Sequence, residues 1–193
     1  MRLLRIPALL ALLLPLAAQA DEIVTLPATT VAMLDREPLR IGSEDDSLAQ
    51  QGSALDAAAG DVVASALSLI GTPYVYGGDA PEGGFDCSGL VSYVYNQAGY
   101  TSTLPRSSQE LYQLHLPAVR RSELQAGDLL FFHIGHSGKG RHAARVNHVA
   151  IYVGNNRFVH APNSRSSVRV DDLDEAYWQR YFVGARRVLS SVR

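Results

Sequence analysis

The spacing of apolar residues changes once along this 193-residue chain, from the period of a helix to that of a strand. In the first half, apolar side chains recur at three- and four-residue intervals, which is typical of helices packed on a core. From Leu129 onward, short apolar runs are separated by turns rich in Gly and Asn, which is typical of strands. Helices followed by strands, rather than an alternation of the two, indicate an α+β fold with an antiparallel sheet.

The predicted helices begin near Leu55, at Asp86-Cys87 and after Arg106, and glycines at 71 and 99 end the first two. Ser107 and Glu110 fit a capping box for the third. The predicted strands cover 129–133, 149–153, 157–160, 167–170 and 183–189, with a short helix at 172–180.

Composition excludes several classes of protein. Apolar residues make up 47% of the chain, which is enough for the core of one domain. With 17 basic and 19 acidic side chains, the chain carries a formal charge of −2, which argues against a nucleic-acid binder that relies on bulk positive charge. The single cysteine excludes an intramolecular disulfide and any multi-cysteine metal site. We expect a monomer that needs neither a metal nor an organic cofactor.

Residues 1–20 have the features of a signal peptide. Arg2 and Arg5 precede an apolar run at 6–16, and Ala18-Gln19-Ala20 fits the small-residue cleavage pattern. The apolar run is shorter than the roughly 20 residues that span a bilayer. The sequence therefore predicts cleavage after Ala20, export to a periplasm and no stable membrane insertion afterwards.

Residues 21–53 contain few large apolar side chains and an acidic patch at 44–46. Such a segment cannot bury much surface, so we expect a flexible linker. The helical pattern that follows places the folded domain at 54–193.

Cys87 has the surroundings of a nucleophile rather than those of a buried structural thiol. It follows a Gly-rich loop and opens a predicted helix, for which Asp86 is suited as the N-cap. The positive end of a helix stabilises a thiolate, so we expect a lowered thiol pKa. A lone thiol in an oxidising compartment also favours a functional role.

A nucleophilic cysteine needs a base, and His148 and His160 are the candidates. They stand on two strands that the turn at 154–156 joins. A three-residue loop would pair Val153 with Arg157 and place both histidines on one face as diagonal neighbours. A two-residue loop would place them on opposite faces, and the sequence leaves both possibilities open.

Three further histidines, His133, His136 and His142, lie in or beside a basic stretch at 134–146. This stretch holds no acidic or cysteine partner and none of the usual paired-ligand spacings. We therefore interpret them as solvated loop residues rather than metal ligands.

Seven short pieces of the chain, in order, resemble the NlpC family of papain-like cell-wall cysteine peptidases. They are GTPYVYGG (71–78), FDCSGL (85–90), LPRS (104–107), GDLLFF (127–132), HVAIY (148–152), FVHA (158–161) and ARRV (185–188). Tyr177-Trp178 and residues 185–190 look most like the periplasmic murein endopeptidases of Gram-negative bacteria. The resemblance implies a papain-like fold in which the N-terminal helices, with the nucleophile at a helix start, pack on a central antiparallel sheet.

The resemblance also implies a catalytic triad of Cys87, His148 and His160, with His160 orienting His148. The hydroxyl of Tyr74 would help to hold the oxyanion beside the backbone N–H of Cys87. Subsite residues would be Asp86 and Ser88, with Arg106 assigned to substrate binding.

The implied activity is hydrolysis of peptide bonds in peptidoglycan, which would be the partner of this protein. The D,D-cross-link between stem peptides is the favoured bond, and the D-glutamyl-diaminopimelate bond within a stem is the alternative. Two further possibilities stay open, a non-catalytic wall-binding protein and an acyltransferase or amidase on the same scaffold.

Overall fold

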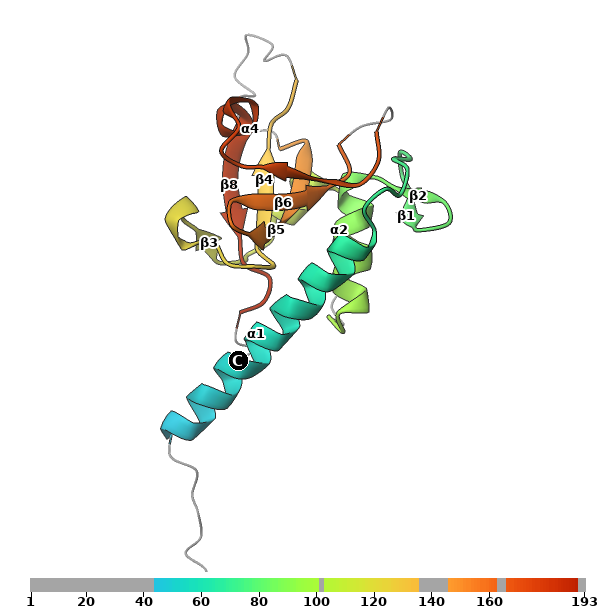
Figure 1. Cartoon of the computed structure of the whole chain (residues 1–193). Helices are drawn as coiled ribbons and strands as arrows, with labels where there is room; N and C mark the ends of the chain where they lie inside the picture. The colour runs from blue at the N-terminus through green and yellow to red at the C-terminus, as the bar shows by residue number, and fades with distance from the viewer. Residues whose placement is uncertain (1–43, 101–102, 136–145, 163–165, 191–193) are drawn as a thin grey trace, which may run out of the picture. The chain divides into compact units, whose positions relative to one another are not determined.

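A six-stranded antiparallel sheet, in the order β3-β8-β4-β5-β6-β7, is the centre of the computed structural model (Figure 1). The structure describes residues 44–100, 103–135, 146–162 and 166–190. The predicted signal peptide, residues 21–43 of the predicted linker, His136 and His142 lie outside them. The strands of the sheet are β3 (Ala118–Val119), β4 (Leu129–Phe132), β5 (His148–Gly154), β6 (Arg157–His160), β7 (Arg169–Asp172) and β8 (Phe182–Arg186). A separate two-stranded ribbon consists of β1 (Asp79–Ala80) and β2 (Gly84–Phe85).

The helices confirm the predicted α+β class. They are α1 (Glu44–Ser68), α2 (Cys87–Gln97), α3 (Ser108–Gln113) and α4 (Ala176–Tyr181), with the 3-10 turn η2 (Arg121–Glu123). The first two helices pack on each other and on β5 (Figure 1). Within the described ranges, no helix is both long and apolar enough to cross a membrane.

Alternation along β4 divides the core into two layers. Leu129 and Phe131 belong to the cluster shared with α1 and α2, whereas Leu130 and Phe132 belong to a cluster that contains Trp178 of α4. All four side chains are fully buried, because both faces of this strand are covered. The strand that carries His148 lies directly beside β4, so the site is built next to the most buried part of the sheet.

Local signals fix both ends of α2. Asp86 is the N-cap, and its carboxylate accepts a hydrogen bond from the backbone N–H of Gly89. At the other end, Gly99 has a φ of 81°, and the N–H of Tyr100 bonds to the carbonyl of Tyr95. This is the Schellman arrangement that the glycine predicted.

Several predicted boundaries were wrong. Helix α1 begins at Glu44, so residues 44–53 of the predicted linker are helical. Ala, Leu and Gln predominate from 48 to 59, and these strong helix formers make a helix without needing much buried surface. At α3, Ser107 is the N-cap but makes no side-chain capping bond, so the capping box does not form; the backbone bond from Leu111 N–H to the Ser107 carbonyl starts the helix instead.

Differences also occur near the C-terminus. β7 continues to Asp172, and α4 starts only at Ala176, because residues 169–172 pair with β6 along their whole length. The last strand ends at Arg186 rather than at residue 189. The longer β7 matters for the site, because it brings Asp171 into the sheet.

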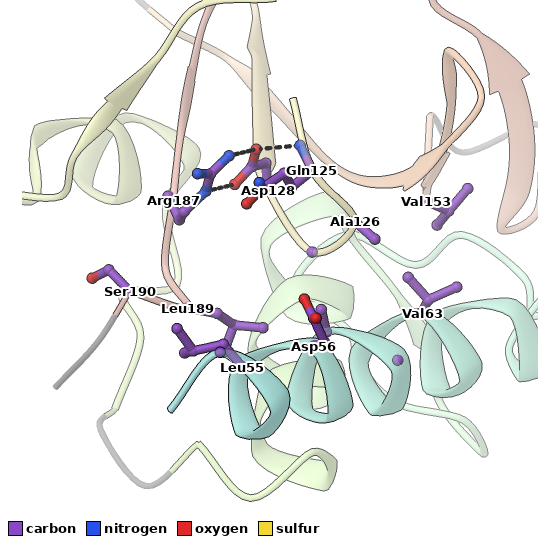
Figure 2. A pocket seen from close by; sticks show the side chains of 14 residues that line it. Leu55, Asp56, Val63, Gln125, Ala126, Asp128, Val153, Arg187, Leu189 and Ser190 are labelled. Carbon is purple, nitrogen blue, oxygen red and sulfur yellow. Dashed lines mark hydrogen bonds and ion pairs between the residues drawn. The ribbon is translucent and has the colours of Figure 1, made fainter. Parts of the chain in front are cut away.

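The family-like pieces at 127–132 and 185–188 meet in one ion pair. Arg187 donates to both carboxylate oxygens of buried Asp128 at 2.8 Å, and the N–H of Gln125 donates to the same carboxylate (Figure 2). These groups line a cavity of about 750 Å³ between the middle of α1, the turn at 125–128 and residues 187–190 (Figure 2). Since this arrangement joins two elements of the domain, we assign Asp128 and Arg187 a structural role.

The first third of α1 should be dispensable for stability. All side chains from 47 to 54 are exposed, whereas Val62 and Ala66 are fully buried. The free energy of unfolding of a chain that starts at residue 53 should therefore lie within about 1 kcal/mol of that of a chain that starts at residue 21, since exposed positions contribute little to stability. A chain that starts at residue 70 lacks both core residues and should fail to fold; denaturant unfolding of the three chains makes the comparison. A loss of several kcal/mol in the first truncation would contradict the boundary.

Candidate active site

Cys87 is the first residue of α2, and the carboxylate of Asp86 holds the loop before it. One oxygen of Asp86 accepts from the N–H of Gly77 at 2.9 Å, and the other accepts from the N–H of Gly89 at 2.6 Å. The hydroxyl of Ser88 lies 3.0 Å from the second oxygen. Asp86 therefore joins the Gly-rich loop to the helix start and fixes the position from which the thiol projects.

The predicted lowering of the Cys87 pKa is wrong. Cys87 is only partly exposed, and this burial raises the pKa of its thiol. A hydrogen bond from the backbone N–H of Val149 opposes the rise, while the negative charge of Asp86 adds to it. Burial outweighs the helix terminus, so the thiol is neutral at rest. The same bond from Val149 brings the sulfur against the start of β5, beside His148.

The turn between β5 and β6 combines features of both loops that the sequence left open. Asn155 and Asn156 have φ of 52° and 57° and form a two-residue turn, across which Gly154 pairs with Arg157. The register then shifts, so that Tyr152 pairs with Phe158 and Ile151 with Val159. Val153 is the extra residue of this bulge, and it restores the register that a three-residue loop would give.

The bulge places His148 and His160 on one face of the sheet. Nε2 of His148 lies 2.9 Å from Nδ1 of His160, and their exposed fractions are 2% and 0%. Burial, together with the neighbouring His160, lowers the pKa of His148 well below its ordinary value. Burial also lowers the pKa of His160, against the opposing effect of the hydrogen bond to Asp171.

Three aromatic side chains surround this pair. The Trp178 ring stacks near His148, with centroids 6.1 Å apart, and meets His160 edge-on at 4.9 Å. Phe132 and Phe158 pack against His148 and His160 respectively. The resulting apolar enclosure explains why both imidazoles are held neutral.

Asp171 is a member of this chain of contacts that the sequence analysis missed. Its Oδ2 lies 3.0 Å from Nε2 of His160, and Arg169 donates to both of its carboxylate oxygens. Partial burial by itself would raise the pKa of Asp171, but the bonds from His160 and Arg169 hold that pKa well below its usual value. The available signal was period-two alternation, which places Arg169 and Asp171 on one face once the strand is extended past residue 170.

The residues predicted to bind substrate gather in one groove with Cys87. A cavity of about 570 Å³ is lined by Tyr74, Asp86, Cys87, Ser88 and Arg106, together with Asn147, the neighbour of His148. Burial raises the pKa of Tyr74, and so do the negative charge of Asp86 and the charge that Cys87 would carry once ionised. The Tyr74 hydroxyl therefore keeps its proton and is able to donate a hydrogen bond to an oxyanion. Among the described residues, no group of three or more His, Cys, Asp or Glu side chains is arranged to hold a metal ion.

The guanidinium of Arg106 bonds to other groups of the protein. Its guanidinium forms an ion pair with Asp79 at 3.1 Å and donates to the carbonyls of Gly77 and Gly78 at 3.3 and 3.2 Å. The Arg106 carbonyl also accepts from Ser88 at 2.8 Å. Arg106 therefore holds the loop before Cys87 in place, while 38% of its side chain stays exposed.

Comparisons with known proteins find relatives of this chain. Residues 71–187 match the model of the NlpC/P60 family. Among relatives, the chain is 45% identical over 125 residues to murein DD-endopeptidase MepH of Escherichia coli K12, which covers 64% of this chain and 44% of MepH. It is 39% identical over 127 residues to the bifunctional muramidase/DL-endopeptidase CwlT of Bacillus subtilis, covering 66% of this chain and 36% of CwlT. The matches thus span less than half of either relative.

A solved structure supports the fold directly. An NlpC/P60 family protein from Bacillus cereus superimposes with a TM-score of 0.59 at 35% identity. The alignment covers 68% of this chain and 40% of that one. The helices and the antiparallel sheet described above are therefore a mixed α+β arrangement already seen in this family.

Two nearby glycines test the packing around Cys87. A Cβ on Gly89 would lie 2.0 Å from the Gly78 carbonyl oxygen and 2.8 Å from Nη2 of Arg106, whereas a Cβ on Gly83 would meet nothing within 4 Å. Gly89→Ala should cost about 1–3 kcal/mol of unfolding free energy and slow alkylation of Cys87, because the loop must move. Gly83→Ala is the matched control, and it should leave the unfolding free energy and the alkylation rate of Cys87 close to those of the wild type. Equal unfolding free energies for the two variants would contradict the close contact.

Proposed function

Because this chain belongs to the NlpC/P60 family, we propose that it is a cysteine endopeptidase that hydrolyses peptide bonds of peptidoglycan. The observation that carries the proposal is the buried hydrogen bond between His148 and His160, together with the bond from the backbone N–H of Val149, the residue after His148, to the thiol of Cys87. A histidine oriented by a second polar group, next to a cysteine, is the arrangement that activates a thiol nucleophile.

The proposed triad is Cys87, His148 and His160, with a Cys–His–His order. His148 takes the thiol proton as the Cys87 sulfur attacks the peptide carbonyl, so that a C–S bond forms and the carbonyl π pair moves to oxygen. The backbone N–H of Cys87 and the Tyr74 hydroxyl stabilise that oxyanion. His148 then gives its proton to the leaving amine as the C–N bond breaks. Water, deprotonated by the same imidazole, then attacks the acyl carbonyl. The C–S bond breaks, and the imidazolium returns the proton to the sulfur of Cys87.

A neutral Cys87 thiol and a neutral His148 imidazole suit this sequence of steps. The raised pKa of Cys87 and the lowered pKa of His148 keep a thiol and an imidazole in place until substrate arrives. His160 accepts a hydrogen bond from His148 and so holds one orientation of its ring. Asp86 and Ser88 shape the groove beside the sulfur, and Arg106 keeps its loop in place.

The proposed substrate is the D,D-cross-link between stem peptides. MepH, which is 45% identical, is named a murein DD-endopeptidase, and this favours the cross-link. CwlT is named a DL-endopeptidase, and it is the reason to keep the D-glutamyl-diaminopimelate bond as the second candidate. For the whole protein we further propose export to the periplasm through the signal peptide at 1–20, and action as a monomer without a metal or cofactor.

Digestion of purified sacculi tests the proposal. Wild-type protein should release muropeptides in which water has been added across a cross-link, as measured by mass. Cys87→Ser should lower the rate of digestion by at least about 10³-fold, because serine has no accessible anion at this position. Its free energy of unfolding should stay that of the wild type. Near wild-type digestion by Cys87→Ser would refute a thiol mechanism.

The products also distinguish the rivals. Cleavage within a stem would identify the D-glutamyl-diaminopimelate peptidase, and transfer to an added amine without gain of water would identify an acyltransferase. Binding of sacculi without any product would identify a wall-binding protein.

Activity should persist below the ordinary pKa of histidine. A base whose pKa is lowered stays unprotonated as the pH falls below 6.5, so the acid limb of kcat/KM should have its midpoint below that pH. The measurement is a pH profile on a soluble cross-linked muropeptide, with circular dichroism at each pH to confirm that the protein stays folded. A midpoint at or above 6.5 would mean that a different group, or a solvated His148, acts as the base.

A further inference from the structure

We propose that Asp171 is a positioning residue, which fixes the proton on Nε2 of His160 and, through it, the proton on Nε2 of His148. The inference rests on the proposed function, because it concerns the base of the same reaction. It extends the triad by one group that is neither in the groove nor predicted by the sequence.

The contacts run in one line across three strands. His148 on β5 bonds to His160 on β6 at 2.9 Å, and His160 bonds to Asp171 on β7 at 3.0 Å. Arg169, two residues before Asp171 on the same strand, donates to its two oxygens at 2.9 and 2.8 Å. The side chain of Asp171 is only 14% exposed, so these bonds hold it in one orientation.

The chemistry of each group dictates where the protons lie. An ionised carboxylate only accepts, so Nε2 of His160 must donate to Asp171. In a neutral imidazole the other nitrogen then carries a lone pair, so Nδ1 of His160 accepts from Nε2 of His148. Nδ1 of His148 is thereby left without a proton, and it is the nitrogen that acts as base. The carboxylate thus selects the tautomer of both rings.

An ordinary surface ion pair does not account for the arrangement. Arg169 is 45% exposed, and exposed pairs of this kind contribute little to stability. The bond between Asp171 and Nε2 of His160 contributes more. The His160 side chain has no exposed surface, so an unpaired donor on it would cost about 1–3 kcal/mol. The bond to His160 is therefore the one that matters for the site.

A second cavity gives experimental access to this carboxylate. A hollow of about 370 Å³ is lined by Arg169, Asp171, Glu175, Tyr177 and Trp178 among others. The titratable groups that contact Asp171 or line this hollow with it are His160, Arg169 and Glu175. A small carboxylate entering this hollow would meet the guanidinium of Arg169.

The first test replaces the carboxylate by an amide. Asp171→Asn should lower kcat about 10- to 100-fold with little change in KM, as removal of a group that orients a functional histidine does elsewhere. Asp172→Asn is the matched control: it makes the same change one position along β7, at an exposed side chain whose oxygen accepts from the Asp174 N–H. It should keep wild-type kcat and KM.

A direct readout of the tautomers separates positioning from folding. Nitrogen-15 NMR of labelled histidines should show protons on Nε2 of both His148 and His160 in the wild type. In Asp171→Asn at least one of these signals should shift to the other tautomer, with an unchanged melting temperature. Unchanged tautomers, or wild-type kcat, in this variant would overturn the proposal.

The second test restores the missing group. Asp171→Gly should be rescued at least fivefold in kcat by formate, and wild type and Asp171→Asn should not respond. Failure of formate to rescue a folded Asp171→Gly would count against the proposal, as would equal stimulation of the wild type. If Cys87→Ser retained activity, the proposed function itself would fail, whereas the tautomer measurement does not depend on which bond is cleaved.

Discussion

The register between β5 and β6 is the constraint on which the site depends. A two-residue turn through Asn155 and Asn156, continued without irregularity, would send His148 and His160 to opposite faces of the sheet. The bulge at Val153 inserts one residue and returns both to the same face as diagonal neighbours. Only then do their nitrogens approach to 2.9 Å inside an aromatic enclosure. One irregular residue therefore decides whether this chain can hold a paired imidazole.

The other half of the site depends on close backbone packing rather than on register. Gly89 in the first turn of α2 lies directly against the carbonyl of Gly78, where no side chain would fit. Asp86 and Arg106 tie that loop to the helix start through hydrogen bonds to Gly77, Gly78 and Gly89. The two halves meet where the N–H of Val149 reaches the sulfur of Cys87. A rigid loop on one side and a fixed register on the other leave the thiol little freedom.

The sequence predicted the features that arise from local chemistry. The cap at Asp86, the helix end at Gly99 and the main strands follow from side chains and turns within a few residues. The bulge at Val153 could not be predicted from the sequence, because the same residues are compatible with a two- or a three-residue loop. Asp171 was missed because the predicted strand ended one residue too soon, and its role depends on a partner eleven residues away in the chain. Residues 44–53 belong to α1 although their low apolar content predicts a linker, because Leu48, Ala49, Gln50 and Gln51 are strong helix formers that extend the helix without burial.

Magnitudes explain why the thiol at a helix start is not acidic here. A helix terminus stabilises a nearby charge by about 0.3–1 kcal/mol at exposed sites, and one pKa unit corresponds to about 1.4 kcal/mol. A helix terminus lowers the pKa of a thiol, whereas burial raises it, by up to several units for a fully buried group. At Cys87 burial is the larger effect, and Asp86 adds a negative charge beside it. The Asp86 carboxylate that caps the helix thus fixes the start of α2 and at the same time adds to the rise in the pKa of the Cys87 thiol. The same burial lowers the pKa of His148, so the two shifts act together. In the proposed mechanism, the proton therefore moves from the thiol to the imidazole only during the reaction. No resting ion pair then has to be desolvated beside the apolar aromatic cluster.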